Sequence, residues 1–254
     1  MRNRLLKCLL VFLSAVFLWV PTAFAVPVGL ELTLLLDVSG SIDAGEYALQ
    51  MTGYQNAFNS SAIQNAIDAN PTGSIAVNMV QWSSSGQQSM VIGWTQVTAA
   101  TAGAFATTIG SVTRAFSDLT APQSAMSYAA SDIVTNNGFE APRQVIDISG
   151  DGVANSGDTT GASGRNAALA AGYDTINGLV IGGDSAVFTY YQNRVIGGTN
   201  AFITTASDFD TFGAAIARKL EREIIGVPEP ASILLLGIGL LGLAGYGRRK
   251  YRKK

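Results

Sequence analysis

The chain has no histidine and only one cysteine, Cys8, among its 254 residues. Cys8 lies in an N-terminal segment that we predict is removed, so the mature chain would contain neither residue type. Disulfides, zinc sites built from Cys or His, cysteine nucleophiles and Ser-His-Asp triads all need one of these side chains. These kinds of cross-link and of catalysis are therefore excluded for the mature chain.

Charged residues are also scarce, at 13% of the chain, and the basic ones are concentrated at the two ends. Residues 26–226 keep seven basic and 17 acidic side chains, a formal charge of −10. An acidic domain of this kind repels nucleic acid and anionic membranes, and it is compatible with attracting divalent cations. About 200 residues is the size of one domain with a sizeable core.

The N-terminus has the order of a secretory signal peptide. Three basic residues (Arg2, Arg4 and Lys7) precede an apolar stretch over residues 9–20, and the small-x-small tripeptide Ala23-Phe24-Ala25 follows. This order predicts cleavage after Ala25, which makes residues 1–25 the signal peptide.

The C-terminus has three successive parts. Pro228-Glu229-Pro230 comes first, an apolar stretch follows within residues 231–247, and a basic cluster occupies residues 248–254. As a helix, the 17 residues from 231 to 247 would be about 25 Å long, slightly short of a full hydrocarbon core. The basic cluster should stay cytoplasmic. An ordinary tail anchor would explain the helix and the charges but not the Pro-Glu-Pro sequence.

This end resembles the PEP-CTERM sorting signal of Gram-negative bacteria, whose three parts it matches in order over residues 227–254. The resemblance implies a transmembrane helix that anchors the chain transiently in the inner membrane. It also implies processing near the motif by an exosortase, and delivery to the cell surface or the extracellular matrix.

Strands and helices alternate between the two ends. Apolar runs predict strands over residues 30–36, 75–82, 89–94, 144–148, 175–181 and 201–205. Helical patterns cover residues 43–60, 98–110, 122–135, 164–172 and 186–195, and Ser207-x-x-Asp210 has the order of a capping box that opens a last helix. We therefore expect an α/β fold with a Rossmann-like, doubly wound sheet. The sheet would have six strands, mostly parallel and with one antiparallel strand at the edge, and helices on both faces.

The most informative motif is Asp37-Val38-Ser39-Gly40-Ser41, directly after the apolar run 30–36. Alternate residues of an extended turn point the same way, so one carboxylate and two hydroxyls would converge. Such oxygen donors suit a hard divalent cation, and open α/β sheets bind ligands at the carboxyl ends of their strands. The alternative is that Asp and Ser only cap the following helix.

Further ligands should come from neighbouring strand ends. Asp151 follows the apolar strand 144–148 between Gly150 and Gly152, which allow close approach to an ion, although such a sequence also forms plain turns. Thr120 is the natural hydroxyl from the preceding loop, because a helix starts just after it. Other hydroxyls available nearby are those of Ser111, Thr113 and Ser124.

Together these residues resemble the von Willebrand factor type A domain (vWA domain) and its metal-ion-dependent adhesion site (MIDAS). The match comprises Asp37-x-Ser39-x-Ser41, then Thr120, then Asp151, and the similarity extends over residues 28–226. The stretch from Tyr190 through Arg194-Val195-Ile196-Gly197-Gly198 is similar to a secreted bacterial branch of the family that has no assigned function. One departure is Leu119, which stands before Thr120 where the family has a small residue.

The resemblance implies how the site works. The two serines and the threonine contact the metal, the aspartates often act through water, and an acidic group of a partner completes the shell. Mg²⁺ is the expected cation, and Mn²⁺ or Ca²⁺ would also suit these oxygen ligands.

Three functions follow for this chain. The leading interpretation is a non-enzymatic, secreted or surface-displayed adhesion module that binds an acidic protein or an acidic matrix polysaccharide through the cation. The second is a structural matrix component in which the metal only stabilises the fold. The third is a metal-dependent hydrolase, for which Asp43, Glu46 and Asp147 would be the candidate acids.

Overall fold

The protein is described by a computed structural model over residues 25–226. The expected signal peptide, the Pro-Glu-Pro sequence and the apolar C-terminal segment lie outside these residues. Within them, no helix is long and apolar enough to cross a membrane.

Nine strands and nine helical segments follow one another along the described chain. The strands are β1 (Val26–Pro27), β2 (Glu31–Asp37), β3 (Ser74–Trp82), β4 (Gln88–Thr98), β5 (Phe139–Glu140), β6 (Gln144–Gly150), β7 (Thr175–Ile181), β8 (Gly197–Gly198) and β9 (Ile203–Ala206). The helices are α2 (Ala44–Asn59), α3 (Ser61–Asp68), α4 (Ala102–Gly110), α5 (Pro122–Ala129), α6 (Asp132–Thr135), α7 (Ser163–Ala170), α8 (Ser185–Tyr190), the π-helical turn η1 (Tyr191–Val195) and α9 (Phe209–Ile225).

The central sheet is mixed but mostly parallel, which confirms the predicted fold class. Its order is β4-β3-β2-β6-β7-β8, and β9 also pairs with β7. The pairs of β2 with β3 and β6, and of β7 with β6 and β9, are parallel. The antiparallel pairs are β3 with β4, which makes β4 the expected antiparallel edge strand, and β7 with β8. The sheet has seven strands rather than six because the two glycines of β8 add a short pairing at the edge.

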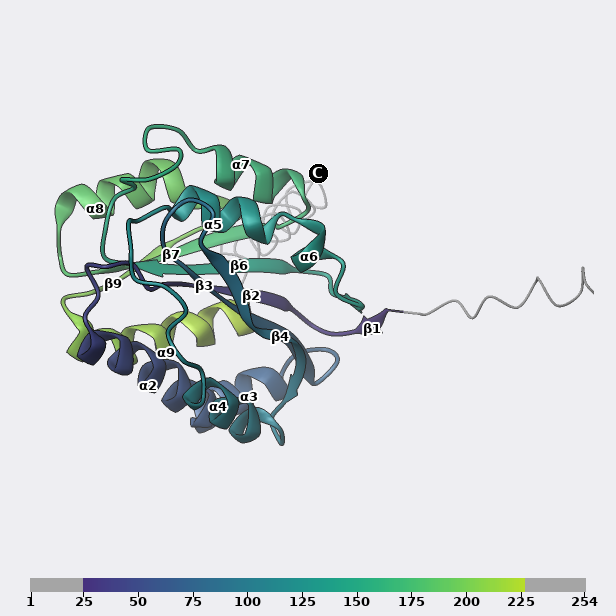
Figure 1. Cartoon of the computed structure of the whole chain (residues 1–254). Helices are drawn as coiled ribbons and strands as arrows, with labels where there is room; N and C mark the ends of the chain where they lie inside the picture. Colours follow the sequence, from purple (N-terminus) through teal and green to yellow (C-terminus); the bar gives the residue numbers. More distant parts are fainter. Residues whose placement is uncertain (1–24, 227–254) are drawn as a thin grey trace, which may run out of the picture.

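The sheet is the middle of three layers. In Figure 1, α2, α3, α4 and α9 cover one face of the sheet, and α5, α6, α7 and α8 cover the other. Strand β2 is buried along its whole length, and its leucines point to opposite faces of the sheet. Leu32, Leu34 and Leu36 join the core under α2 and α9, whereas Leu35 joins the core under α5 and α7. The apolar run therefore forms a central strand that is covered on both faces.

The helices differ from the predictions in several local details. Helix α3 was not predicted, and α4 begins at Ala102 rather than at residue 98, because Thr98 still belongs to β4. The expected helix 122–135 divides into α5 and α6 at Ala130 and Ser131. The expected helix 186–195 continues into the π-helical turn η1. The last helix is capped by Asp208 rather than Ser207: its side chain accepts from Thr211 N, and the Thr211 hydroxyl reaches back to Asp208 N. Thr211 therefore takes the place of the expected Asp210.

The register of the sheet brings two strand ends together. Leu36 of β2 lies beside Ser149 of β6, so the chain leaves both parallel strands at the same edge. Asp37 is the last residue of β2, and Asp151 comes directly after β6. The two aspartates singled out in the sequence therefore lie at one end of the molecule.

Candidate functional site: oxygen ligands at the carboxyl ends of β2 and β6

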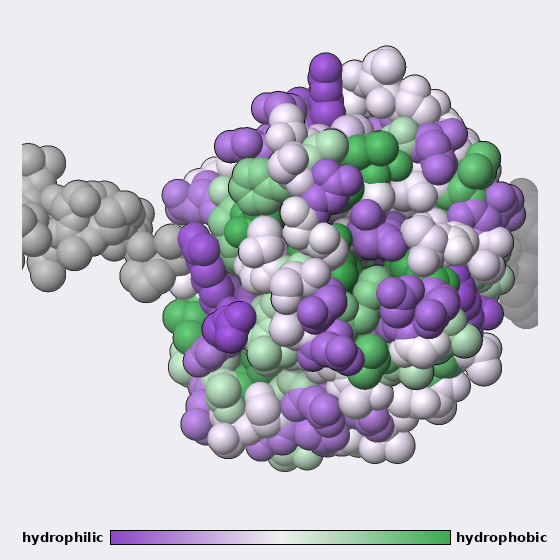
Figure 2. All heavy atoms as spheres, turned by 90° about the vertical axis from the view of Figure 1, so that its left-hand side faces the viewer, coloured by the Kyte–Doolittle hydropathy of each residue, from purple (hydrophilic) through white to green (hydrophobic). Residues whose placement is uncertain are grey.

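The predicted ligands come from three segments that end at the same face, which Figure 2 shows as a surface of mixed hydrophilic and hydrophobic residues. Asp37, Ser39 and Ser41 span the end of β2 and the loop before α2, Asp151 follows β6, and Thr120 lies two residues before α5. Asp37, Ser39 and Thr120 are buried, Asp151 is half-buried and Ser41 is exposed. The site thus has a buried floor and an accessible rim.

Hydrogen bonds join four of the five residues in a chain. Ser39 N donates to Asp37 Oδ1 at 2.8 Å, and the Ser39 and Ser41 hydroxyls lie 3.2 Å apart. Ser41 Oγ donates to Asp151 Oδ1 at 2.8 Å. The alternation in the turn therefore has the predicted effect: the side chains at 37, 39 and 41 converge with the carboxylate that follows β6.

Thr120 reaches the same place from a separate loop. Its Oγ1 lies 3.5 Å from the position that a Cβ would take on Gly152, the residue next to Asp151. Asn155 fixes this loop, because its side-chain oxygen accepts from Thr120 N at 2.7 Å and its own N donates to Thr120 O at 2.9 Å. Two of the three alternative hydroxyls are engaged elsewhere: Ser111 Oγ donates to Thr108 O, and Ser124 Oγ donates to Ser85 Oγ.

The residues before Thr120 connect its loop to the turn after β2 and to Ser83. The Asp118 carbonyl accepts from Gly40 N at 2.6 Å, which ties this loop to the Asp37–Ser41 turn. Ser83 Oγ bridges the two neighbouring peptide groups by accepting from Asp118 N and donating to Leu119 O. The Leu119 side chain points outward and is 49% exposed. The unusual leucine is therefore accommodated at the surface.

Arg114 supports the site and was not singled out from the sequence. Its guanidinium donates to Val38 O at 2.9 Å, to Ser39 O at 2.7 Å and to Phe116 O at 2.8 Å, so it ties the turn after β2 to the loop before Thr120. One signal was available, because Arg114 is the only basic residue between Lys7 and Arg143. A single arginine in a long segment without other basic residues indicates that this side chain has a specific structural role.

The electrostatics of Asp37 favour a cation beside it. Burial raises the pKa of the Asp37 carboxyl from its ordinary value to about 7, and the negative charge of Asp151 acts in the same direction. The hydrogen bonds from Ser39 and the charge of Arg114 oppose this rise only in part. Asp37 Oδ2 is buried and accepts no hydrogen bond from the described residues. Such an oxygen is costly to bury unless a charge compensates it, so the residues fit a divalent cation.

The ligand set would depend on hydroxyl groups. Residues 25–226 contain no cluster of three or more His, Cys, Asp or Glu side chains of the kind that holds a metal ion. Two carboxylates and three hydroxyls remain at the site, all of them hard oxygen donors.

The three acids considered for catalysis form their contacts with residues other than the five candidate ligands. Asp43 and Glu46 form a reciprocal capping box at the start of α2, at 2.8 Å in both directions. Asp147 lies inside the protein against Lys219. None of the three is joined to the hydroxyl and carboxylate chain by a hydrogen bond among the described residues.

Solved structures of similar architecture include vWA domains, pilus proteins and a matrix protein of the mussel byssus. The vWF domain of the type V pili tip protein Mfa5 from Porphyromonas gingivalis superposes with a TM-score of 0.55 and 12% identity, over 81% of this chain and 98% of that one. Proximal thread matrix protein 1 from the mussel byssus, with a zinc-occupied MIDAS motif, gives a TM-score of 0.56 and 15% identity, over 78% of this chain and 45% of that one.

A third similar structure is the pilus adhesin SpaC from Lactobacillus rhamnosus GG. It has a TM-score of 0.54 and 15% identity, and the match covers 78% of this chain and 31% of the adhesin. The chain thus spans less than half of the mussel protein and less than a third of the adhesin. At these identities the likeness shows the fold, which is that of the vWA domain. No protein of curated function matches the sequence.

Family models place the chain more closely. Residues 27–228 match the family described as "Protein of unknown function (DUF1194)", and the chain belongs to this family. Residues 226–250 match the PEP-CTERM protein-sorting motif, which confirms the resemblance drawn from the Pro-Glu-Pro sequence. The motif implies export, processing by an exosortase and surface localisation.

Proposed function

We propose that the chain is an exported adhesion module that binds an acidic ligand through a divalent cation held by Asp37, Ser39, Ser41, Thr120 and Asp151. The observation that carries this proposal is the convergence of these oxygens at one sheet edge, with Asp37 Oδ2 buried and without a hydrogen-bond partner among the described residues. Support comes from the pilus proteins among the structural neighbours, from the zinc-occupied MIDAS motif of the mussel protein and from the sorting motif.

Each residue has a distinct part in the proposed site. Asp37 supplies a buried negative charge at the floor, and the backbone of Ser39 keeps one of its oxygens fixed. Ser41 and Asp151 lie at the accessible rim, where a ligand would approach. When bound, a cation such as Mg²⁺ supplies positive charge and an open coordination position for an acidic oxygen. The formal charge of −10 on residues 26–226 would otherwise repel an acidic ligand.

Direct contacts between protein groups favour a binding role over a purely stabilising one. Arg114, Ser83 and Asn155 tie the loops around the site to one another through hydrogen bonds between protein atoms. A metal that only held these loops together would duplicate contacts that already exist. We therefore propose that the cation serves the ligand, and that the chain folds without it.

The first experiment is a melting curve of the purified full chain in EDTA and then in Mg²⁺, Mn²⁺ or Ca²⁺. A cation at 100 times its Kd adds about 2.7 kcal/mol to the free energy of unfolding, which raises Tm by roughly 5–10 °C for a domain of this size. Ser41→Ala should abolish the rise. Ser61→Ala, at an exposed serine of α3, is the matched control and should keep it.

The second experiment tests the ligand class. Poly-aspartate and alginate, a protein-like and a saccharide polyanion, are each titrated against the full chain with cation and with EDTA. We expect at least one to bind only in the cation, and Ser41→Ala to remove that binding. Equal binding in EDTA would contradict the proposed role of the metal. The alternative function, a matrix component whose metal only stabilises the fold, would show the Tm rise without cation-dependent binding of either probe.

The proposed localisation is the cell surface or the extracellular matrix, reached through transient insertion in the inner membrane. The match to the sorting motif supports export and processing. Fractionation of cells that produce the full chain should find the shortened protein outside the inner membrane, and deletion of residues 228–230 should retain it there.

A further inference from the structure

A second polar cluster lies inside the protein, away from the candidate cation site. Lys219 and Glu223 are one turn apart on α9, and both face the sheet. Asp147 of β6 and Asn177 of β7 face them, as paired residues on neighbouring strands. The side chains of Lys219, Asp147 and Glu223 have no exposed surface at all.

The distances within this cluster are short. Lys219 Nζ lies 2.7 Å from Asp147 Oδ1 and 2.6 Å from Glu223 Oε1. Asn177 Nδ2 donates to the same Glu223 oxygen at 2.9 Å. One amine is thus enclosed by two carboxyl groups, and a single ion pair would leave the second carboxyl without a counter-charge.

The two carboxyl groups meet the amine in different ways. The contact with Glu223 is a hydrogen bond. Asp147 Oδ1 lies 2.7 Å from the amine, but the angles at this contact do not suit a hydrogen bond. A carboxyl carbon lies about 1.2 Å from its oxygen, so Asp147 Cγ is within roughly 4 Å of Lys219 Nζ. Groups held at such distances by a rigid scaffold react far faster than the same groups free in solution.

We propose that Lys219 Nζ and Asp147 Cγ join in an amide bond with loss of one water molecule, so that α9 is covalently linked to β6. This inference is independent of the cation site. The nitrogen lone pair forms the new C–N bond, the C–O bond of the Asp147 carboxyl breaks, and the leaving hydroxyl departs as water with a proton from the amine. No oxidant, reductant or cofactor is needed.

Glu223 is placed to carry that proton. Its Oε1 already contacts the amine, and Asn177 holds the carboxyl in position. Burial and the nearby Asp147 raise the pKa of the Glu223 carboxyl to about 8, so near neutral pH this group can both accept and release a proton. Replacing a buried ammonium and a buried carboxylate by a neutral amide also removes the cost of burying two charges.

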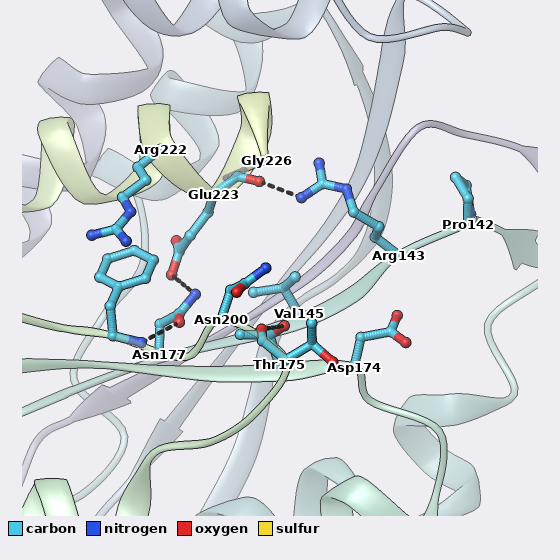
Figure 3. A pocket seen from close by; sticks show the side chains of 12 residues that line it. Pro142, Arg143, Val145, Asp174, Thr175, Asn177, Asn200, Arg222, Glu223 and Gly226 are labelled. Atoms are coloured by element: carbon cyan, nitrogen blue, oxygen red, sulfur yellow. Dashed lines mark hydrogen bonds between the residues drawn. The ribbon is translucent and has the colours of Figure 1, made fainter. Parts of the chain in front are cut away.

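A cavity borders the cluster on the side of Glu223 and Asn177, and the departing water would leave on that side. This cavity has a volume of about 240 Å³ and lies at the end of the molecule where β6 and β7 begin. Figure 3 shows Glu223 pointing from α9 into this space toward Asn177, with Arg143 on the opposite side. Arg143 donates to the carbonyls of Glu223 and Ile224, which holds the last turn of α9 in place.

The position of the link gives it a mechanical consequence. Helix α9 ends at Ile225, and the match to the sorting motif begins at residue 226. A pull on the C-terminal end would therefore reach α9 first. An amide to β6 would pass the force to a central strand of the sheet instead of to the packing of one helix.

The test is a peptide map of the full chain, denatured and digested with trypsin, because processing at either end would complicate an intact mass. Cleavage after Arg143, Arg165, Arg218 and Arg222 should give peptide 144–165 joined to peptide 219–222. Its mass should be about 18 Da below the sum of the two peptides. Recovery of free 144–165, with normal cleavage after Lys219 and no joined species, would overturn the proposal. A bond from Lys219 to Glu223 would also overturn it.

Variants test the role of each group. Lys219→Arg keeps a positive charge but has no amine, so free peptide 144–165 should appear. Glu223→Gln should lower the joined fraction at least tenfold, whereas Glu221→Gln on the same helix should leave it unchanged. An undiminished link in Glu223→Gln would overturn the assignment of Glu223 as the proton carrier. The wild-type map is decisive even if Lys219→Arg fails to fold.

Discussion

The Tyr191 hydroxyl and the Asp37 carboxylate meet at Gly150. A Cβ added to Gly150 would lie 2.5 Å from the Tyr191 hydroxyl and 2.8 Å from Asp37 Oδ2. Both oxygens are buried, and neither has a hydrogen-bond partner among the described residues. Tyr191 is the first residue of η1, and π-helical turns often occur at functional sites. Tyr191, at the start of the stretch from Tyr190 to Gly198, thus lies beneath the candidate cation site.

Gly150→Ala should destabilise the protein, because the added methyl group would collide with both side chains. Overpacking of this kind costs about 1–3 kcal/mol in the free energy of unfolding. Urea denaturation of both proteins measures the difference. Gly93→Ala is the matched control in β4, where a Cβ would meet nothing within 4 Å. Equal losses in the two variants would show that the close approach at Gly150 is not the cause.

Two buried tyrosines should respond in opposite ways to loss of their hydroxyl. Tyr173 shares a hydrogen bond with Thr33 Oγ1 at 2.9 Å, so Tyr173→Phe should cost about 1 kcal/mol in the free energy of unfolding. Tyr191→Phe removes a hydroxyl that has no such partner and should be neutral or stabilising in EDTA. Denaturant midpoints measured in EDTA distinguish the two. A clear loss in Tyr191→Phe would mean that its hydroxyl is hydrogen-bonded in solution.

Much of the fold and the convergence of the candidate ligands could be predicted from local patterns. The apolar run before Asp37 and the alternation at 37, 39 and 41 are properties of a few neighbouring residues. The capping of α9 was misjudged by one residue because Ser207 and Asp208 are both good caps, and only the Thr211 contact separates them.

The internal cluster could not be predicted. Lys219 and Glu223 have the spacing of an ordinary exposed ion pair on a helix. Only the packing of α9 on the sheet turns both side chains inward to meet Asp147, and Asp147 lies 72 residues earlier in the chain. Sequence periodicity describes one helix at a time, so it does not show what that helix will cover.

The stability of the metal-free protein should depend on pH through Asp37. Its folded pKa of about 7 lies above the ordinary value of 3.8, so between these values the folded state holds a proton that the unfolded state has lost. The contribution of Asp37 to stability in EDTA should therefore be fully present below about pH 4 and be lost as the pH rises to about 7, by up to about 4 kcal/mol. Asp37→Asn cannot titrate there and should lack this component of the slope. If the free energy of unfolding changed with pH in the same way in both proteins, Asp37 would not be the group with the raised pKa.

Arg114→Ala should weaken cation binding without removing any proposed ligand. The guanidinium fixes the carbonyls of Val38 and Ser39 and so positions the turn that presents Ser39 and Ser41. Losing charge-assisted hydrogen bonds of this kind costs roughly 1.5–3 kcal/mol. Because the bound cation needs the turn in this position, we expect the Kd for Mg²⁺ to rise about tenfold or more.

Isothermal titration with Mg²⁺ measures this effect, with urea denaturation in EDTA as the parallel measure of folding. Arg218→Ala is the matched control, because Arg218 is exposed on α9 and forms no ion pair within residues 25–226. Both variants lower the net charge by the same amount, so a general electrostatic effect would change the two affinities equally. A change confined to Arg114→Ala would show that the geometry of the turn, rather than the charge of the domain, determines how tightly the cation is held.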